Sequence, residues 1–274
     1  MVNKAQLKTQ FIELTQVSNT TATKYLENAK YDLGTAIDKY FSKHPNNHHK
    51  SETIIKIPHD SKLIKLFDKY KSDEKNDIID IDGTISYLED LNIQPEDFKA
   101  LIIAFLLKSP KMGVFNKSNF IGIWSNLNIN NLEGMKSYIN KYESSILMTN
   151  FDTFKKIYQF AFKFSVELEN QKLLEIETCI DYWNLLIPKI LKIEEVNTDL
   201  DEGKINERVE QWYTFLKEYE KKSLTFDSWS MFYSFLIEII FKDPEGFNDY
   251  DEMAAWPSII DEYIEYLHDN KLLN

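Results

Sequence analysis

Glycine is scarce in this chain, which holds 7 Gly and 7 Pro in 274 residues. An average chain carries roughly twice that combined share. No two of the glycines lie closer than nine residues apart. Phosphate-binding loops, dinucleotide fingerprints and the Gly-x-Ser-x-Gly nucleophile elbow all need closely spaced glycines. The sequence therefore excludes these motifs, and it disfavours a strand-rich fold, which needs glycine for its turns.

Apolar residues recur at helical spacing along almost the whole chain. We expect three short helices in residues 5–42, and the polar stretch 44–58 between two prolines indicates a linker. Further helices are expected near 60–70, 84–91, 95–108, 117–126, 131–141, 149–165, 175–187, 205–220, 225–240 and 256–268, with an extended stub at Asp80-Ile81-Asp82. The predicted fold class is all-α, with a three-helix bundle at 1–45, a linker at 46–58 and a larger helical domain at 59–274.

The charge balance is acidic, with 32 Lys and Arg against 44 Asp and Glu and a net charge of −12. Proteins that bind nucleic acid or anionic membranes need a surplus of basic residues, so we expect neither as a partner. A basic protein surface is the expected partner instead. The longest apolar run, Leu101 to Leu107, is far shorter than the roughly twenty residues of a membrane span. With no signal-peptide core at the N-terminus, we expect a cytoplasmic and nuclear protein.

Side chains suited to catalysis or metal binding are few. Cys179 is the only cysteine, which excludes an intrachain disulfide and fits a reducing compartment. On a helix it shares a face with Trp183 and has no basic neighbour, so we expect a core residue rather than a reactive thiolate. His44, His48 and His49 cluster in the linker without a cysteine to complete a zinc site. We expect no catalytic residue, no metal and no cofactor, and a binding protein rather than an enzyme.

The residues from Phe67 to Leu91 outline a helix–loop–helix hand. A calcium-binding loop needs acidic ligands at its first, third and fifth positions, glycine at the sixth and glutamate at the twelfth. Loops starting at Asp73, Asp80 and Asn197 each lack glycine at the sixth position. We therefore predict EF-hand-like units that lack calcium ligands, and a calcium-regulated protein is a disfavoured alternative.

Residues 243–269 form the most asymmetric stretch of the chain, and we call them the acidic segment. They contain nine Asp and Glu and no Lys or Arg. These acids interleave with Trp256, Pro257 and Tyr263, and the alanine pair at 254–255 leaves space for a partner's side chain. Such a surface suits a protein partner that presents Lys or Arg.

The strings Asp249-Tyr250-Asp251-Glu252, Ala255-Trp256-Pro257 and Ile260-Asp261-Glu262 resemble the C-terminal signature of the defective-in-cullin-neddylation family. The conserved unit of that family is the potentiating-neddylation domain. Further landmarks follow in the family's order: Ile81-Asp82-Gly83, Leu101-Ile102-Ile103-Ala104, Phe154-Lys155 with Tyr158-Gln159-Phe160, Tyr182-Trp183-Asn184-Leu185 and Asp227-Ser228-Trp229. The resemblance covers about residues 60–269 of the chain.

The resemblance implies a non-catalytic scaffold that promotes neddylation of cullins. Such a scaffold binds the C-terminal winged-helix region of the cullin and the dedicated conjugating enzyme at the same time. The implied cullin-facing residues are Asp227, Ala255 and Asp261. The implied second site is an apolar pocket for the N-acetylated N-terminal Met of the conjugating enzyme. Its implied residues are Ile81, Asp82, Thr84, Ala100, Leu101, Ile103, Ala104, Leu107, Met112, Gly113, Phe115, Phe164, Tyr182 and Leu185.

The stretches Ala22-Thr23-Lys24-Tyr25-Leu26, Asp32-Leu33 and Tyr40-Phe41 are similar to a ubiquitin-associated (UBA) domain, which many family members carry. Ubiquitin-binding members typically show Met-Gly-Phe in the first loop, where this chain has Thr15-Gln16-Val17. Two interpretations stay open for residues 5–42. They form a structural or regulatory bundle, or they bind ubiquitin or the ubiquitin-like modifier. The second interpretation makes a ubiquitin-binding adaptor the alternative function.

Overall fold

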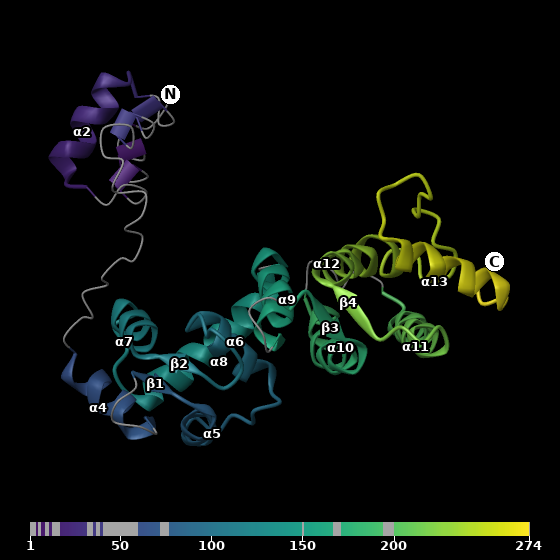
Figure 1. Cartoon of the computed structure of the whole chain (residues 1–274), viewed down its shortest axis with the longest axis horizontal. Helices are drawn as coiled ribbons and strands as arrows, with labels where there is room; N and C mark the ends of the chain where they lie inside the picture. Colours follow the sequence, from purple (N-terminus) through teal and green to yellow (C-terminus); the bar gives the residue numbers. More distant parts are fainter. Residues whose placement is uncertain are drawn as a thin grey trace. The chain divides into compact units, whose positions relative to one another are not determined.

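The computed structural model describes residues 4, 7, 8, 11, 12, 17–31, 35, 36, 39, 40, 60–71, 77–149, 151–166, 171–193 and 200–273. The chain divides into two compact units, residues 1–56 and 57–274, which Figure 1 shows coloured along the sequence. The predicted linker at 46–58 lies outside the described residues.

The N-terminal unit contains α2 (Asn19–Asn28), which begins where the sequence offers capping side chains. The amide of Thr21 donates to Ser18 Oγ across 3.3 Å, which satisfies one of the free N–H groups at the helix start. Residues 4, 7, 8, 11 and 12 and residues 35, 36, 39 and 40 are also helical, and the ends of these two predicted helices lie outside the described residues. The core of this unit consists of Phe11, Ala22, Leu26, Ala29, Ala36 and Tyr40.

The larger unit is built from helices and four very short strands among its described residues. Its elements are α4 (Ser61–Tyr70), β1 (Ile78–Ile79), α5 (Ile81–Asp90), α6 (Phe98–Leu106), β2 (Phe115–Asn116), α7 (Lys117–Asn126), α8 (Leu132–Thr149), α9 (Phe151–Ser165), β3 (Leu173–Glu175), α10 (Ile176–Ile190), α11 (Glu202–Glu218), β4 (Ser223–Thr225), α12 (Phe226–Phe235), the π-helical turn η2 (Leu236–Ile240) and α13 (Ser258–Asp269). The prediction of an all-α fold is confirmed. Within the described ranges, no helix has the length and apolar character needed to cross a membrane.

Two pairs of helix–loop–strand–helix units make up most of the larger unit (Figure 1). β1 pairs antiparallel with β2, with Ile79 opposite Phe115, and so joins α4 and α5 to α6 and α7. β3 pairs antiparallel with β4, with Leu174 opposite Leu224, and so joins α9 and α10 to α11 and α12. The likeness of these units to EF-hands stays a prediction.

Every helix predicted between residues 60 and 268 has a counterpart in the structure. The largest difference is in α8, which continues to Thr149 instead of ending near residue 141. The prediction of an extended stub at residues 80–82 was wrong. The carboxylate of Asp80 accepts a hydrogen bond from the amide of Gly83 across 3.2 Å, so Asp80 caps α5, which begins at Ile81. The strand pairing lies two residues earlier, in β1.

The core of the larger unit consists of two clusters of buried apolar side chains. One cluster gathers residues of α4 to α8, and the other gathers mainly residues of α9 to α13. Phe160 and Phe164, both on α9, pack against the two clusters. Helix α9 therefore joins the two halves of the unit.

Tyr158, Trp183 and Trp229 meet at the centre of the second cluster, and all three are fully buried. The Tyr158 hydroxyl donates to the carbonyl of Trp229 across 2.9 Å, and Trp229 Nε1 donates to the carbonyl of Tyr158 across 3.0 Å. Trp183 Nε1 donates to the Tyr158 hydroxyl across 2.8 Å. These bonds tie α9, α10 and α12 together.

Gly83 marks the closest approach of α4 and α5. A Cβ atom at this position would lie 1.9 Å from the carbonyl oxygen of Tyr70, a distance that no side chain tolerates. Glycine is therefore needed for packing in the Ile81-Asp82-Gly83 landmark, independently of any role in binding.

Candidate protein-binding sites

An apolar cavity of about 570 Å³ lies between α5, the start of α6, the loop before β2 and helices α9 and α10. Its lining includes Ile81 and Met112, whose side chains are 57% and 54% exposed. Large exposed apolar side chains around an apolar cavity are typical of a binding site rather than of a closed core. The cavity draws its walls from both halves of the larger unit.

Most of the residues that the resemblance implied for a pocket line this cavity. Those that do are Ile81, Thr84, Ala100, Leu101, Ala104, Met112, Gly113, Phe115, Phe164, Tyr182 and Leu185. Three implied residues do not line it. Asp82 is exposed and lies off the α5 stripe that faces the cavity, while Ile103 and Leu107 are fully buried in the core of α4 to α8. Helix α6 is apolar almost all round, so its sequence does not distinguish the cavity face from the core face.

The structure adds lining residues that the sequence analysis missed. They are Ile85, Leu88, Pro95, Glu96, Asp97, Thr178 and Asp181. Helical spacing could have found most of them. On α5 the lining positions follow the steps 81, 84, 85 and 88, and on α10 they follow 178, 181, 182 and 185. Residues 95–97 precede α6 in a loop, where no periodic signal exists.

The loop that carries Met112 and Gly113 is fixed against α5. The Thr84 hydroxyl donates to the carbonyl of Gly113 across 3.0 Å. Gly113 has a φ of +70°, in the left-handed region that favours glycine, and a Cβ there would lie 3.0 Å from Ile81 Cγ1. Burial raises the pKa of Tyr182 on the opposite wall, so its hydroxyl keeps its proton. One wall of the cavity is thus held to α5 by a hydrogen bond, and the lining has no basic residue.

The acidic segment comprises the loop that follows η2 and helix α13, and Figure 1 shows this loop projecting away from the helices. The Tyr250 hydroxyl donates to Asp261 Oδ1 across 2.5 Å, and the Tyr250 ring stacks on Trp256. Ala255 is exposed and Asp261 is half-buried. The structure therefore places Ala255 and Asp261 together at the start of α13, held by one aromatic cluster.

Asp227 is on a different element from these two residues, helix α12. It is exposed in the first turn of α12, eight positions before Phe235, whose ring contacts Trp256. Eight residues of helix span about 12 Å along the axis. Asp227 also lines a second cavity, of about 950 Å³, together with Lys111, Lys163 and Lys172. The field around Asp227 is therefore mixed in sign, unlike that of the acidic segment.

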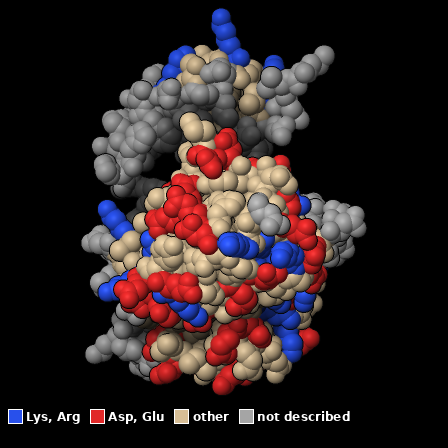
Figure 2. All heavy atoms as spheres, turned by 90° about the vertical axis from the view of Figure 1, so that its right-hand side faces the viewer, with Lys and Arg blue, Asp and Glu red and all other residues tan. Residues whose placement is uncertain are grey.

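Figure 2 shows the face of the molecule that lies on the right-hand side of Figure 1, where Asp and Glu gather in several groups with fewer Lys among them. Two of the nine acids of the acidic segment form ion pairs with lysines among the described residues. Glu262 lies 2.6 Å from Lys221 and Asp249 lies 3.7 Å from Lys242. Most of the negative charge of this segment is thus available to attract a basic partner.

The remaining candidates from the sequence are Cys179 and three histidines of the predicted linker. Cys179 is fully buried and its thiol points to the carbonyl of Leu174 at 3.8 Å. Burial raises the pKa of this thiol to about 12, so it carries no thiolate near neutral pH. The histidines at 44, 48 and 49 lie outside the described residues. Among the described residues, no group of three or more His, Cys, Asp or Glu side chains is placed to hold a metal ion.

Two domain families match the sequence. The family described as cullin binding matches residues 134–266, which run from the start of α8 through most of α13 and include much of the acidic segment. A UBA-like domain family matches residues 6–47. Fold and sites together therefore define an all-α protein with an N-terminal UBA-like domain and a cullin-binding domain.

Whole-chain relatives narrow this class to one family. The chain is 47% identical to "Defective in cullin neddylation protein 1" of Candida albicans, over the full length of both chains. It is 36% identical to the protein of the same name from Yarrowia lipolytica, over 74% of this chain and 76% of that one. The Saccharomyces cerevisiae protein of this name is 26% identical over 95% and 93% of the two chains. The chain belongs to the defective in cullin neddylation family.

Proposed function

We propose that this protein is a non-catalytic scaffold that promotes neddylation of cullins by holding a cullin and the conjugating enzyme on one rigid unit. The observation that carries the proposal is the presence, in a single compact unit, of an apolar cavity and a separate acidic surface. Two different surfaces of this kind suit two different partners.

The cullin side of the proposal uses Asp227, Ala255 and Asp261. The carboxylate of Asp261 is oriented by the Tyr250 hydroxyl, and the small side chain of Ala255 leaves room beside it. A carboxylate held in one orientation forms strong, directional hydrogen bonds with Lys or Arg. Asp227, in the first turn of α12, provides a second carboxylate for another basic side chain of the C-terminal winged-helix region.

The conjugating-enzyme side uses the apolar cavity. A free α-amino group has a pKa of about 7.7–8.0 and is mostly charged at neutral pH. Burying an unpaired ammonium in an apolar cavity costs several kcal/mol, whereas an acetylated terminus carries no charge. The lining has no basic residue, and its three acidic residues, Glu96, Asp97 and Asp181, are exposed to solvent. Its hydroxyls come from Thr84, Thr178 and Tyr182, which can pair with an amide. The proposed ligand is therefore the N-acetylated N-terminal Met of the conjugating enzyme.

Rate enhancement in this proposal needs no nucleophile from the scaffold. The thioester is on the conjugating enzyme, and a cullin lysine attacks it. Binding both partners to one body raises their effective concentration and restricts their orientation. The RING subunit of the cullin complex still activates the thioester.

Sequential calorimetric titrations test whether both partners bind at once. The full chain is saturated with a cullin C-terminal fragment, and the acetylated N-terminal peptide of the conjugating enzyme is then added. The proposal predicts that the peptide binds the saturated protein as tightly as it binds the free protein. Mutually exclusive binding would show that the two surfaces do not act as a scaffold.

The alternative function, a ubiquitin-binding adaptor, rests on the UBA-like match at residues 6–47. In this alternative, residues 5–42 bind ubiquitin or the ubiquitin-like modifier and are needed for activity. The discriminating variant lacks residues 1–45 and is assayed for cullin modification with purified components. Full activity of the shortened chain disfavours the adaptor, and loss of activity favours it.

A further inference from the structure

Arg208 is the only arginine in the chain, and every other basic residue among the 32 is a lysine. It lies on α11 and its side chain is buried, with 1% of the residue exposed. Burying a guanidinium is costly unless its N–H groups find acceptors. A guanidinium buried in an acidic protein therefore needs a structural explanation.

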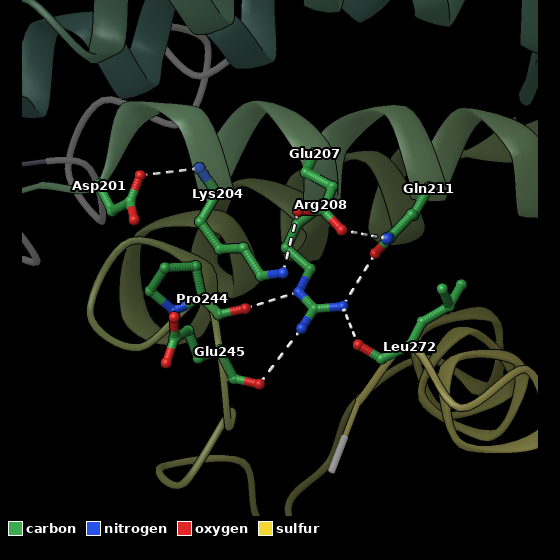
Figure 3. Close-up of polar contacts among 8 residues, drawn as sticks. All are labelled: Asp201, Lys204, Glu207, Arg208, Gln211, Pro244, Glu245 and Leu272. Carbon is green, nitrogen blue, oxygen red and sulfur yellow. Dashed lines mark hydrogen bonds and ion pairs between the residues drawn. The ribbon is translucent and has the colours of Figure 1, made fainter.

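The Arg208 side chain contacts its own helix and two other segments of the chain, as Figure 3 shows. Nε donates to the carbonyl of Pro244 across 2.6 Å, and Nη2 donates to the carbonyl of Glu245 across 3.2 Å. Nη1 donates to the carbonyl of Leu272 across 2.7 Å and to Gln211 Oε1 across 2.9 Å. Four of the five donors of the guanidinium are thus used, and none of their acceptors is a carboxylate.

Two of these acceptor carbonyls belong to Pro244 and Glu245, which lie near the start of the acidic segment. The turn that follows is ordered by Asp243, whose carboxylate accepts from the amides of Gly246 and Asn248 across 3.0 and 3.1 Å. The ring of Phe247 lies 5.3 Å from the guanidinium carbon of Arg208. The first residues of the acidic segment are therefore held against α11 by Arg208.

The backbone of Arg208 holds the other end of the same segment. The Tyr263 hydroxyl, on α13, donates to the carbonyl of Arg208 across 2.7 Å. Tyr263 lies two residues after Asp261. Arg208 thus contacts the acidic segment in two places. Its side chain contacts the first residues of the segment, and its backbone carbonyl contacts α13.

We propose that Arg208 is a positioning residue for cullin binding, which fixes the acidic segment so that Ala255 and Asp261 are presented in one geometry. The inference rests on the assignment of cullin binding to these two residues. Arg208 makes no contact with the partner, because it is buried. Lysine cannot replace it, since an ammonium is a single point charge and lacks the planar fork that reaches all three segments.

Arg208→Lys in the full chain tests this inference. Its affinity for a cullin C-terminal fragment is expected to fall about tenfold, as for loss of hydrogen bonds to a charged group. Its affinity for the acetylated N-terminal peptide of the conjugating enzyme is expected to stay unchanged, because the cavity is lined by other helices. Hydrogen–deuterium exchange is expected to quicken in residues 241–257. The matched control is Lys204→Met, which removes a partly exposed charge from the same helix and is expected to bind both partners normally.

The outcomes separate this inference from the proposed function. If Asp261→Lys abolishes cullin binding while Arg208→Lys binds like wild type, the positioning role of Arg208 is wrong. If Arg208→Lys loses affinity for the cullin fragment and for the acetylated peptide to the same extent, Arg208 supports the whole unit and the inference is also overturned. If Asp261→Lys leaves cullin binding intact, the cullin-site assignment itself fails.

Should Arg208→Lys not fold, Gln211→Leu is the second variant, because it removes only one of the acceptors of Arg208. A selective loss of cullin affinity in Gln211→Leu supports the inference, whereas unchanged affinity refutes it.

Discussion

The Tyr250 hydroxyl donates a hydrogen bond of 2.5 Å to Asp261 Oδ1, which connects the projecting loop to the first turn of α13. Burial, followed by this hydrogen bond, raises the pKa of Tyr250 well above its ordinary value, so the hydroxyl remains a donor at all physiological pH values. The carboxylate that we assign to cullin binding is therefore oriented before the partner arrives. Preorganisation of this kind lowers the entropy lost on binding.

Tyr250→Phe is expected to weaken cullin binding without preventing folding. The variant keeps the ring that stacks on Trp256 and loses only the hydroxyl that orients Asp261. A loss of about 1 kcal/mol, or roughly fivefold in affinity, is expected for a half-exposed hydrogen bond of this kind. Tyr219→Phe, at the exposed C-cap residue that follows α11, serves as the control. Equal affinities for Tyr250→Phe and wild type, measured by calorimetry, would show that this orientation is unimportant.

The apolar cavity is expected to distinguish acetylated from free peptide termini in a pH-dependent way. If only the neutral amine enters, the affinity of the free peptide rises about tenfold per pH unit below the α-amino pKa of about 7.7–8.0 and then levels off. The affinity of the acetylated peptide stays constant over the same range, because it has no ionisable terminus. Fluorescence anisotropy between pH 6 and pH 9 measures both series. A free peptide with pH-independent affinity would indicate that the cavity tolerates the ammonium.

Gly83→Ala is expected to destabilise the larger unit strongly. The added Cβ would lie 1.9 Å from the carbonyl oxygen of Tyr70, so α4 and α5 must separate, at a cost of roughly 3 kcal/mol or more. Gly203→Ala is the matched control, since a Cβ there lies 3.3 Å from Asp201 Oδ1 at the exposed start of α11. Its effect is expected to stay within about 1 kcal/mol, because alanine favours a helix. Urea unfolding of both variants gives the comparison, and similar stabilities would contradict the close packing of α4 and α5.

Burial of Cys179 is expected to appear in the pH dependence of unfolding. The pKa of its thiol rises from 9.0 to about 12 in the folded protein, so above pH 9 the unfolded state loses a proton that the folded state keeps. The free energy of unfolding therefore falls between pH 9 and pH 12 by this contribution, which is fully present below pH 9. The difference in the free energy of unfolding between wild type and Cys179→Ala, measured against pH, separates the contribution of this thiol from the titration of the tyrosines. A pH-independent difference, or rapid reaction of the native thiol with a disulfide reagent at pH 8, would contradict the buried position.

Local sequence patterns were sufficient to predict the helices, whereas the residues of the cavity were implied by the family resemblance. The apolar positions of α5 and α10 recur at helical spacing, and this spacing places Ile81, Thr84, Tyr182 and Leu185 on inward faces. The same rule fails for Ile103, because α6 is apolar on nearly every side and only the packed neighbours decide which side faces a cavity. The assignment of an individual residue on such a helix needs the tertiary structure.

Contacts between distant segments could not be predicted from one sequence. Arg208 lies between Glu207 and Val209 on a helix with ordinary polar spacing, yet three of its four acceptors are 36 to 64 positions away. The lysines that share a cavity with Asp227 come from positions 111, 163 and 172. Long-range hydrogen bonds and charge neighbours depend on how the helices pack, which the periodicity of one chain does not encode.

The central claim is that both partner sites must be on the same molecule, and a mixing experiment tests it most directly. Asp261→Lys removes the cullin contact, and Ala100→Trp fills the cavity that Ala100 lines. Asp269→Lys, at the exposed end of α13, is the control for charge reversal. The rate of cullin modification is measured with wild type, with each variant alone and with the two variants mixed. The account predicts that the mixture is as inactive as either variant alone, because no single molecule holds both partners. Restoration of the wild-type rate by the mixture would contradict it.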